Sequence, residues 1–474
     1  MLGQIALKEL RELWRSPVVV VALALLAAML LALCLGQFVK AMRLQDLHES
    51  AVKASRQDWL NQGNHDPHSA AHHGVDVYKP FPPLGVFDEG IFAAQGTTLK
   101  VEAHHQHRLE NRPSEGATQL LQPMIDSPAI ALETVFPLVA IMLGFASISR
   151  ERERGTLALL LSQGVVWRRL LFGKALALAT IIAGLALPAA ATLLAAALFM
   201  GDWSRDALVR AGLIGLSFVL YGGLWSLVIV WISAHSRNSG VSFLTLIALW
   251  IGWVLVIPPA ALDFAQFRFP LPTAEALKAQ HDNVVRYGDD GKNAFRRIYR
   301  ELEEQLKKEH GVDDVADLPI NFEGASMLAA EKFTDDLIDR FEADLAEIQR
   351  SQMSMFQSCS FVSPYIAIRL ASMSLAGTDD LHHAEFSAAA EHYRRSLVRT
   401  LNEALTVKRN GDTAAPDRRL LWESIPPFEW SPPPWSAAVR HTRQPLLSLL
   451  CWFLVCTIGL WATPVRYETL GTAH

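Results

Sequence analysis

The chain has 474 residues, of which 51% are hydrophobic and only 19% are charged, and its mean hydropathy is +0.19. This much apolar surface excludes an intrinsically disordered chain, and the charged fraction is below the ~25% of an average soluble domain. The formal net charge of −5 provides no basic footprint for nucleic acid. The four cysteines do not form the pattern of a disulfide scaffold.

Six apolar segments are long enough to cross the ~30 Å hydrocarbon layer of a membrane. They are residues 17–39, 129–148, 175–200, 211–233, 241–261 and 446–463. The first carries no charge and is not followed by the small-residue cleavage site of a signal peptide. The predicted fold class is therefore an all-α integral membrane protein with six transmembrane helices.

The distribution of lysine and arginine predicts how these spans are oriented. Residues 1–16 carry three basic residues and residues 149–174 carry six, whereas the much longer segment 41–127 carries seven against eleven acids. We therefore expect both termini and residues 149–174 to be cytoplasmic. The remaining units are then an interfacial helix (1–16), two extracytoplasmic insertions (40–128 and 262–445) that form a mainly helical domain, and a cytoplasmic tail (464–474).

The segment between the second and third spans, residues 149–174, reads SRERERGTLALLLSQGVVWRRLLFGK. Alternating charges precede an apolar stripe, Gly164 interrupts the stripe, and a basic stretch leads into the third span. Charge density alone favours a simple positive-inside stop signal. A charged helix at the membrane face also offers a surface that a soluble partner can bind.

The pattern E-x-E-x-G-T-L-x-x-L-L from Glu151 to Leu161, followed by Arg168-Arg169 and Gly173-Lys174, resembles the signature of ABC-type 2 transporter permeases. In that family the equivalent turn forms the coupling helix that docks on the ATP-binding subunit, although proline is usual where this chain has Gly164. The amphipathic N-terminus resembles the family's interfacial elbow helix and has the composition of a helix lying in the interface. The resemblance implies an ATPase-docking set: Arg150, Glu151, Glu153, Gly155, Thr156, Leu157, Arg168, Arg169 and Lys174.

The sequence contains no motor of its own. A phosphate loop requires G-x-x-x-x-G-K-[ST], but Gly173-Lys174 is followed by alanine, and Arg168 stands where the first glycine is required. The chain is therefore not expected to be an enzyme by itself, and no cofactor is expected. The resemblance implies an exporter or extractor in the bacterial cytoplasmic (inner) membrane, partnered by an ATP-binding subunit and by a second copy or a similar permease.

Eight of the sixteen histidines lie between residues 48 and 107. Their surroundings resemble an uncharacterised branch of the same family, with the motifs P-H-x-A-A-H at 67–72 and E-A-H at 102–104. Neutral imidazoles bind Zn²⁺ or Cu²⁺, so an alternative metal site would use His65, His68, His72 and His104. Their spacing matches no standard metal motif, so we expect hydrogen-bonded structural roles for His68, His72 and His104, and no metal.

The second insertion contains two apolar stripes at helical spacing, one from Phe295 to Leu306 and one from Phe333 to Ile348, which predict packed helices. The run SPYIAIRLASMSLAGTDD that follows is expected to lie against the membrane or to cap a cavity, with Asp379 or Asp380 as a helix N-cap. Further on, Trp422, Trp430 and Trp435 suit an aromatic belt at the outer interface.

Glu133 is the one acid inside a predicted span. A charged group in lipid is costly and is a functional-site hypothesis by default. Because Glu133 lies near one end of its span, we expect its carboxylate to reach the interface.

Three functions fit the sequence. The first is a permease subunit of an ABC transporter. The second is an ATPase-driven sensor or mechanical transmitter that acts on an extracytoplasmic partner without transport. The third is a membrane-anchored metal-binding protein without a motor.

Overall fold

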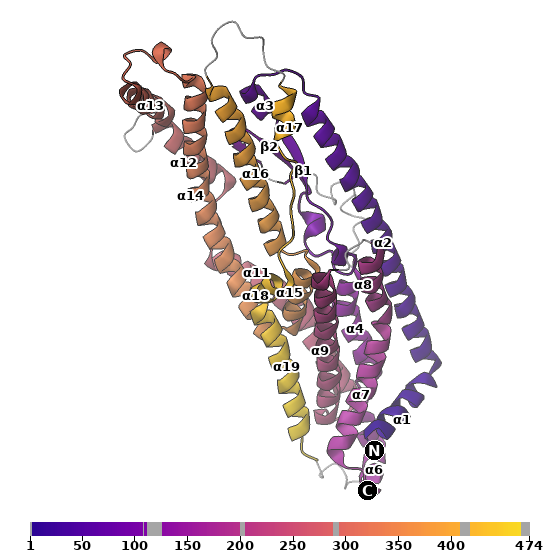
Figure 1. Ribbon diagram of the computed structural model, residues 1–474. Helices are drawn as coiled ribbons and strands as arrows, with labels where there is room; N and C mark the ends of the chain where they lie inside the picture. The colour runs from indigo at the N-terminus through magenta and orange to yellow at the C-terminus, as the bar shows by residue number, and fades with distance from the viewer. Residues whose placement is uncertain are drawn as a thin grey trace.

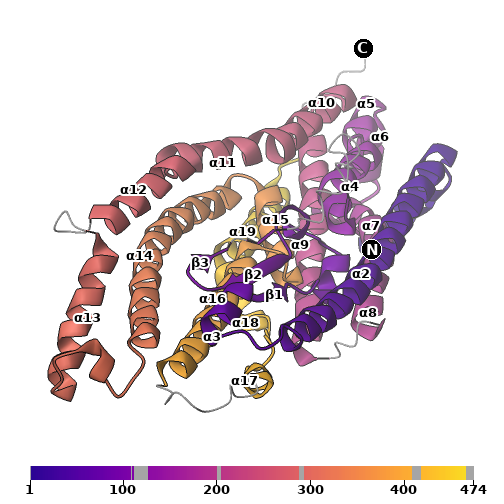
Figure 2. The same cartoon turned by 90° about the horizontal axis from the view of Figure 1, so that it is seen from above.

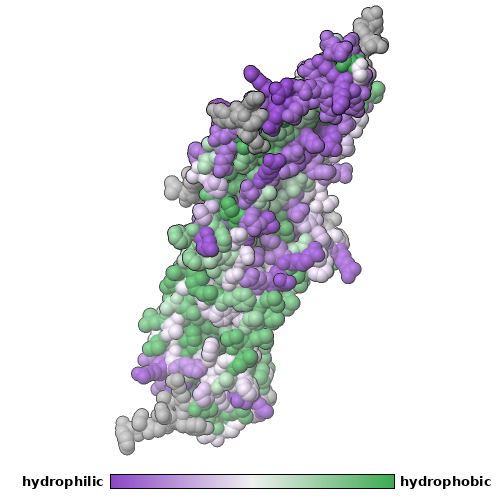
Figure 3. All heavy atoms as spheres, turned by 90° about the vertical axis from the view of Figure 1, so that its left-hand side faces the viewer, coloured by the Kyte–Doolittle hydropathy of each residue, from purple (hydrophilic) through white to green (hydrophobic). Residues whose placement is uncertain are grey.

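The computed structural model describes residues 2–107, 109–110, 126–199, 204–287, 293–407 and 418–465. The molecule is elongated and largely helical (Figure 1). Its lower half presents a mainly apolar surface and its upper half a mainly polar one, and polar residues return at the lower tip (Figure 3). We call the lower half the membrane bundle and the upper half the distal domain. The predicted tail, residues 464–474, is described only as far as residue 465.

Within the described residues, six helical stretches are long and apolar enough to cross a membrane: Pro17–Leu60, Pro128–Glu153, Trp167–Ala196, Arg205–His235, Ser239–Arg268 and Arg443–Ala462. Each contains or closely matches one of the predicted spans, so the predicted fold class is confirmed. The helices that build them are α2 (Pro17–Leu60), α4 (Pro128–Gly144), α7 (Trp167–Leu185), α8 (Leu187–Phe199), α9 (Arg205–His235), α10 (Ser239–Trp250), α11 (Ile257–Arg268) and α19 (Arg443–Ala462), with a π-helical turn, η4 (Ile251–Val256), between α10 and α11.

The bundle packs around α9, which contacts α4, α7 and α19. Trp225 and Ile229 of α9 are fully buried in its largest apolar core. Glycines allow the neighbouring helices to come close: a Cβ atom added to Gly144 would lie 2.6 Å from Cγ2 of Ile229. Small residues are typical of helix contacts in membranes, where no water remains to drive apolar surfaces together.

The distal domain begins where α2 leaves the bundle as one uninterrupted helix of 44 residues. The chain then forms α3 (Pro67–His73) and an antiparallel sheet of order β1-β2-β3, made of β1 (Val75–Tyr78), β2 (Thr98–Glu102) and β3 (His105–Gln106). Val77 and Val101 alternate with exposed or half-buried residues and are buried, which explains the strand geometry. The first insertion thus adds a small sheet to a domain that the sequence predicted to be mainly helical.

The second insertion supplies α12 (Ala274–Tyr287), α13 (Ala294–His310), α14 (Phe322–Ser358), α16 (Asp380–Thr406), α17 (Arg419–Ser424) and α18 (Trp435–His441). Both predicted stripes lie on helices, α13 and α14. Helix α13 ends where Gly311 takes the left-handed conformation, with φ 65°. Helices α12 to α14 extend to one side of the molecule (Figure 2). The two insertions also contain short 3-10 helical turns: η1 (Pro83–Val86), η2 (Phe92–Ala94), η5 (Val315–Asp317) and η6 (Cys359–Phe361).

Helix α15 (Pro364–Ala376) joins the two halves of the molecule. It is buried along most of its length and contacts α9, α19 and α4. It therefore packs across the end of the bundle, whereas the sequence predicted that this run would lie against the membrane or cap a cavity. Asp379 then caps α16, accepting a hydrogen bond from the backbone N–H of His382 at 3.2 Å, as predicted.

The predicted belt of three tryptophans was wrong for two of them. Trp422 is 1% exposed in the distal core, where its ring lies 5.6 Å from that of Trp59. Trp430 packs against Phe386 in the same core. Trp435, at the start of α18, is 38% exposed. Trp422 lies in α17, Trp435 begins α18, and only Trp430 lies outside a helix. The sequence could not show that this segment folds back onto the distal domain.

Candidate functional site

The segment singled out by the sequence, residues 149–174, lies at the lower tip of the bundle beside α1 (Leu2–Trp14) (Figure 1). It forms two short helices, α5 (Ser149–Glu153) and α6 (Thr156–Ser162), before α7 begins. Gly155 separates α5 from α6 with φ 69°, and Gly164 follows α6 with φ 83°. A residue with a side chain would be strained by about 1–2 kcal/mol at either position. We call Ser149–Ser162 the turn helices.

Lys174 connects three helices at this tip. Its ammonium group is buried and lies 2.7 Å from Oε1 of Glu9 on α1 and 2.8 Å from Oε1 of Glu151 on α5. The N-terminal helix and the turn helices are thus held to α7 by one shared cation.

Two further residues hold the turn helices to the bundle. Arg152 donates to the carbonyl oxygen of Ala234 at 2.6 Å and to that of Ser236, at the end of α9. Glu153 accepts from the backbone N–H of Ser239 at 2.7 Å and from its hydroxyl at 2.8 Å, which caps the start of α10. A displacement of the turn helices would therefore act directly on α7, α9 and α10.

The predicted docking residues divide into two groups. Arg150, Glu153, Gly155, Thr156, Arg168 and Arg169 are exposed, whereas Leu157 and Lys174 are buried and Glu151 is half-buried. Leu157 belongs to the bundle core, and the guanidinium carbon of Arg168 lies 3.9 Å from the ring centroid of Trp461. Leu157 and Lys174 therefore hold the turn helices in place and present no surface to a partner.

Sequence reasoning missed Leu159, an apolar residue on the solvent face of α6 that is 58% exposed. The available signal was its helical phase, because Leu157 and Leu161 lie on the buried side. Leu159 and the basic residues Arg150 and Arg154 line a cleft of about 650 Å³ between α1, α4 and the turn helices.

Replacing Lys174 with methionine is expected to destabilise the purified protein by about 3 kcal/mol, because two largely buried carboxylates lose their partner. Thermal unfolding in detergent measures the loss. Lys8→Met is the matched control, since Lys8 pairs with exposed Glu12 at 3.2 Å. Adding Glu9→Gln and Glu151→Gln to the Lys174 variant should restore much of the stability, and an equal loss in both lysine variants would contradict this role.

Glu133 does not reach the interface, so the favoured interpretation of this residue was wrong. It is fully buried, and its carboxylate lies 3.7 Å from Nη1 of Arg369 on α15. Arg369 also binds Oδ1 of buried Asp88 at 2.8 Å. The partner comes from the second insertion, so the intramembrane acid joins α4, α15 and the loop after η1 into one charged junction.

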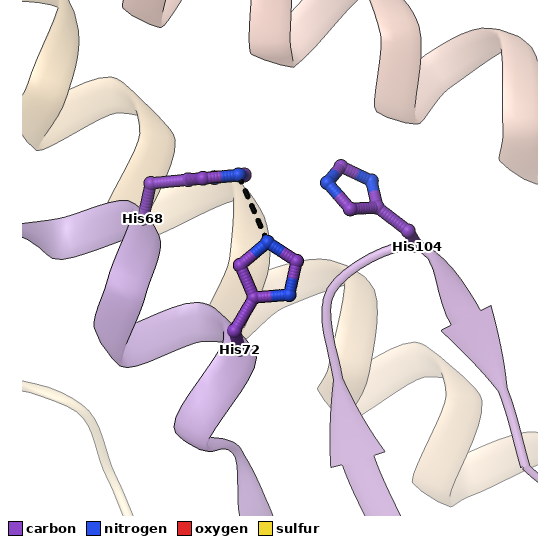
Figure 4. Close-up of side chains that lie close together, drawn as sticks. All are labelled: His68, His72 and His104. Carbon is purple, nitrogen blue, oxygen red and sulfur yellow. Dashed lines mark hydrogen bonds between the residues drawn. The ribbon is translucent and has the colours of Figure 1, made fainter.

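Three of the four histidines proposed as alternative metal ligands lie together at the far end of the distal domain, and Figure 4 shows their rings facing one another. One ligand atom from each of His68, His72 and His104 lies within 4.8 Å of the others. His65 is exposed on the loop before α3 and is not part of this cluster.

Each of these rings takes part in a hydrogen bond, as the sequence led us to expect. His68 shares one with Oδ1 of Asn402 at 3.2 Å, His72 with His68 at 3.1 Å, and His104 with Oε2 of Glu331 at 2.7 Å. Burial, and then the neighbouring imidazoles, hold the pKa of His72 below its ordinary value. Burial raises the pKa of Glu331, but the hydrogen bonds from His104 and Arg394 outweigh it and lower that pKa to about 2.

Residues 274–431 match a family model described as Domain of unknown function (DUF3526). The match covers about a third of the chain and runs from the start of α12 to the segment that follows α17. No curated protein matches the chain. The fold and this match together define a multi-span helical membrane protein with a DUF3526 domain. The matched part contributes Glu331 and Asn402 to the histidine cluster, while the three histidines lie outside it.

Proposed function

We propose that the chain is the permease subunit of an ATP-driven ABC transporter that exports or extracts its substrate, with ATP hydrolysed by a separate subunit. The observation that supports this proposal most strongly is the pair of turn helices, which present Arg150, Arg154 and Leu159 to solvent. Lys174, Arg152 and Glu153 hold them to three bundle helices, α7, α9 and α10. A partner that grips this surface can move the spans as a unit. The resemblance to ABC-type 2 permeases gives the partner its identity, an ATP-binding subunit.

A second permease, either another copy or a similar chain, completes the pathway in this proposal. The chain lies in the bacterial inner membrane with both termini and the turn helices in the cytoplasm, and the distal domain is extracytoplasmic. The excess of arginine and lysine at the lower tip supports this orientation.

This orientation predicts that single cysteines placed at His68 and Glu342 react with an impermeant thiol reagent in intact spheroplasts. Background Cys359 and Cys451 would first be replaced, because neither is buried. A cysteine at exposed Gln163, next to α6, is the control and should react only after lysis. If the cysteine at Gln163 reacted in intact spheroplasts and the other two positions were protected, the protein would have the opposite orientation in the membrane.

One observation also favours the mechanical transmitter. Helix α2 runs without interruption for 44 residues, or about 66 Å, from the lower tip into the distal domain. Tilting its lower half would therefore move the domain above. In this function the ATPase drives a change in an extracytoplasmic partner and no substrate crosses the membrane.

Reconstitution with the ATPase subunit in proteoliposomes distinguishes the two functions. The permease function predicts that substrate stimulates ATP hydrolysis and changes sides in proportion to it. Hydrolysis stimulated by an extracytoplasmic partner, without movement of any candidate substrate, would support the transmitter. Co-purification of an ATPase alone would fit both.

A further inference from the structure

The histidine cluster has the dimensions of a metal centre. Zn²⁺ bound by three imidazoles in tetrahedral geometry, at 2.0–2.1 Å from each nitrogen, requires ring centroids about 5.2 Å apart. The centroids are separated by 4.7 Å for His68 and His72, 5.3 Å for His68 and His104, and 5.1 Å for His72 and His104. The rings already stand where a single ion would hold them.

Two hydrogen bonds orient the rings of His68 and His104 by holding the Nδ1 atom of each. Nδ1 of His68 donates to Oδ1 of Asn402, and Nδ1 of His104 donates to Oε2 of Glu331. Both rings therefore direct an Nε2 lone pair inward, and Nε2 of His72 lies 3.1 Å from that of His68. Amide and carboxylate acceptors of this kind hold the outer nitrogen of metal-binding histidines.

Local structure is adapted to bring the rings together. His68 and His72 are four residues apart and so lie on one face of α3. Small buried residues let α3 approach the hairpin, where the backbone N–H of Ala103 donates to the carbonyl oxygen of Ala71 at 2.9 Å. His104 has φ 64°, the only positive value for a non-glycine residue in the described ranges, and Glu331 fixes its backbone N–H at 3.2 Å. Such strain persists where the surrounding structure enforces it, which is common at functional sites.

The surroundings suit a cation. Glu331, Asp335 and Glu391 all bind Arg394. Arg395 also binds Glu391, at 2.7 Å, so three carboxylates face two guanidinium groups behind His104. His72 is exposed, which leaves a route for an ion and a place for a fourth ligand from solvent.

The other group of candidate ligands in the described chain, Asp379, Asp380 and His441, is less suitable, because Asp379 already caps α16.

We propose that His68, His72 and His104 bind one Zn²⁺-class divalent metal ion through their Nε2 atoms, with a fourth position open to solvent. The ligands come from the first insertion and their hydrogen-bond acceptors from the second, so the ion couples the two insertions. This site does not depend on the ATPase or on transport.

The test uses the full chain, purified without a histidine tag, stripped with a chelator and dialysed. Zn²⁺ is titrated in competition with a chromophoric chelator. We expect about one equivalent to bind with a dissociation constant of about 1 µM or lower, and a higher thermal midpoint in the bound form. Co²⁺ in place of Zn²⁺ should give the strong visible absorption of four-coordinate cobalt.

Variants distinguish a built site from adventitious binding. His72→Ala should weaken Zn²⁺ binding about 100-fold. Glu331→Gln, which removes the carboxylate shared by His104 and Arg394, should weaken it about tenfold. His73→Ala is the matched control, because this neighbouring ring contacts Asp58 at 3.0 Å instead, and it should bind like the wild type. Absence of stoichiometric Zn²⁺ in the wild type, or equal binding by His72→Ala and His73→Ala, would overturn the proposal.

Discussion

Replacing Leu159 with glutamate is expected to weaken docking of the ATPase subunit by about 30-fold, equivalent to about 2 kcal/mol. The residue is 58% exposed on α6 beside two arginines, so a partner that covers it would have to bury the new carboxylate. The substitution changes no buried contact of the bundle, and the protein should insert and purify normally. Binding of the ATPase subunit to permease in detergent or nanodiscs, followed by ATP hydrolysis, measures the effect.

The matched control for this experiment is Leu420→Glu. Leu420 is an equally apolar residue, 70% exposed on α17 at the opposite end of the molecule. It should leave docking and hydrolysis unchanged. If both variants bound the ATPase subunit equally well, the turn helices would not be part of the docking surface.

Replacing Arg394 with methionine is expected to lower the free energy of unfolding of the distal domain by about 4 kcal/mol. Arg394 is 1% exposed and binds Glu331 at 2.5 Å, Glu391 at 2.8 Å and Asp335. Its removal would leave three acids largely buried without their shared cation. Denaturant unfolding can follow the fluorescence of Trp59 and Trp422, which are buried in the same domain.

Arg395→Met provides the comparison one residue along the same helix. Arg395 is partly exposed and binds Asp339, whose side chain is 56% exposed, at 2.6 Å. It also binds Glu391 at 2.7 Å, but Arg394 still neutralises that carboxylate when Arg395 is removed. Exposed ion pairs contribute little, so we expect a loss of about 1 kcal/mol. If both arginine variants lowered the free energy of unfolding by the same amount, the buried network around Arg394 would not be the main link between α14 and α16.

The six spans could be predicted because lipid constrains both the length and the polarity of a crossing helix. Helix ends were predictable where a local rule applies, as at Gly311 after α13 and Asp379 before α16. The position of Trp422 was predicted wrongly because it depends on a tertiary contact with Trp59, which is far away in the sequence.

The candidate sites show the same division. The sequence identified the turn helices but could not separate exposed Arg150 from buried Lys174, whose two acidic partners lie on other helices. It named His68 and His72 with His65 and His104 as an alternative metal site, although it favoured hydrogen-bonded structural roles without metal. Their convergence with His104 depends on a hairpin and on Glu331, a residue of the other insertion. Likewise, the partner of Glu133 is supplied from across the chain.

The proposed docking of a separate ATP-binding subunit on the turn helices is tested most directly by crosslinking. A photoreactive residue would replace Leu159 in one protein and Leu420 in another, each expressed in cells with the native neighbouring genes. We predict that Leu159 alone captures a polypeptide that contains a G-x-x-x-x-G-K-[ST] loop and binds ATP. Capture of that polypeptide from both positions, or capture of no ATP-binding polypeptide from Leu159, would contradict the account.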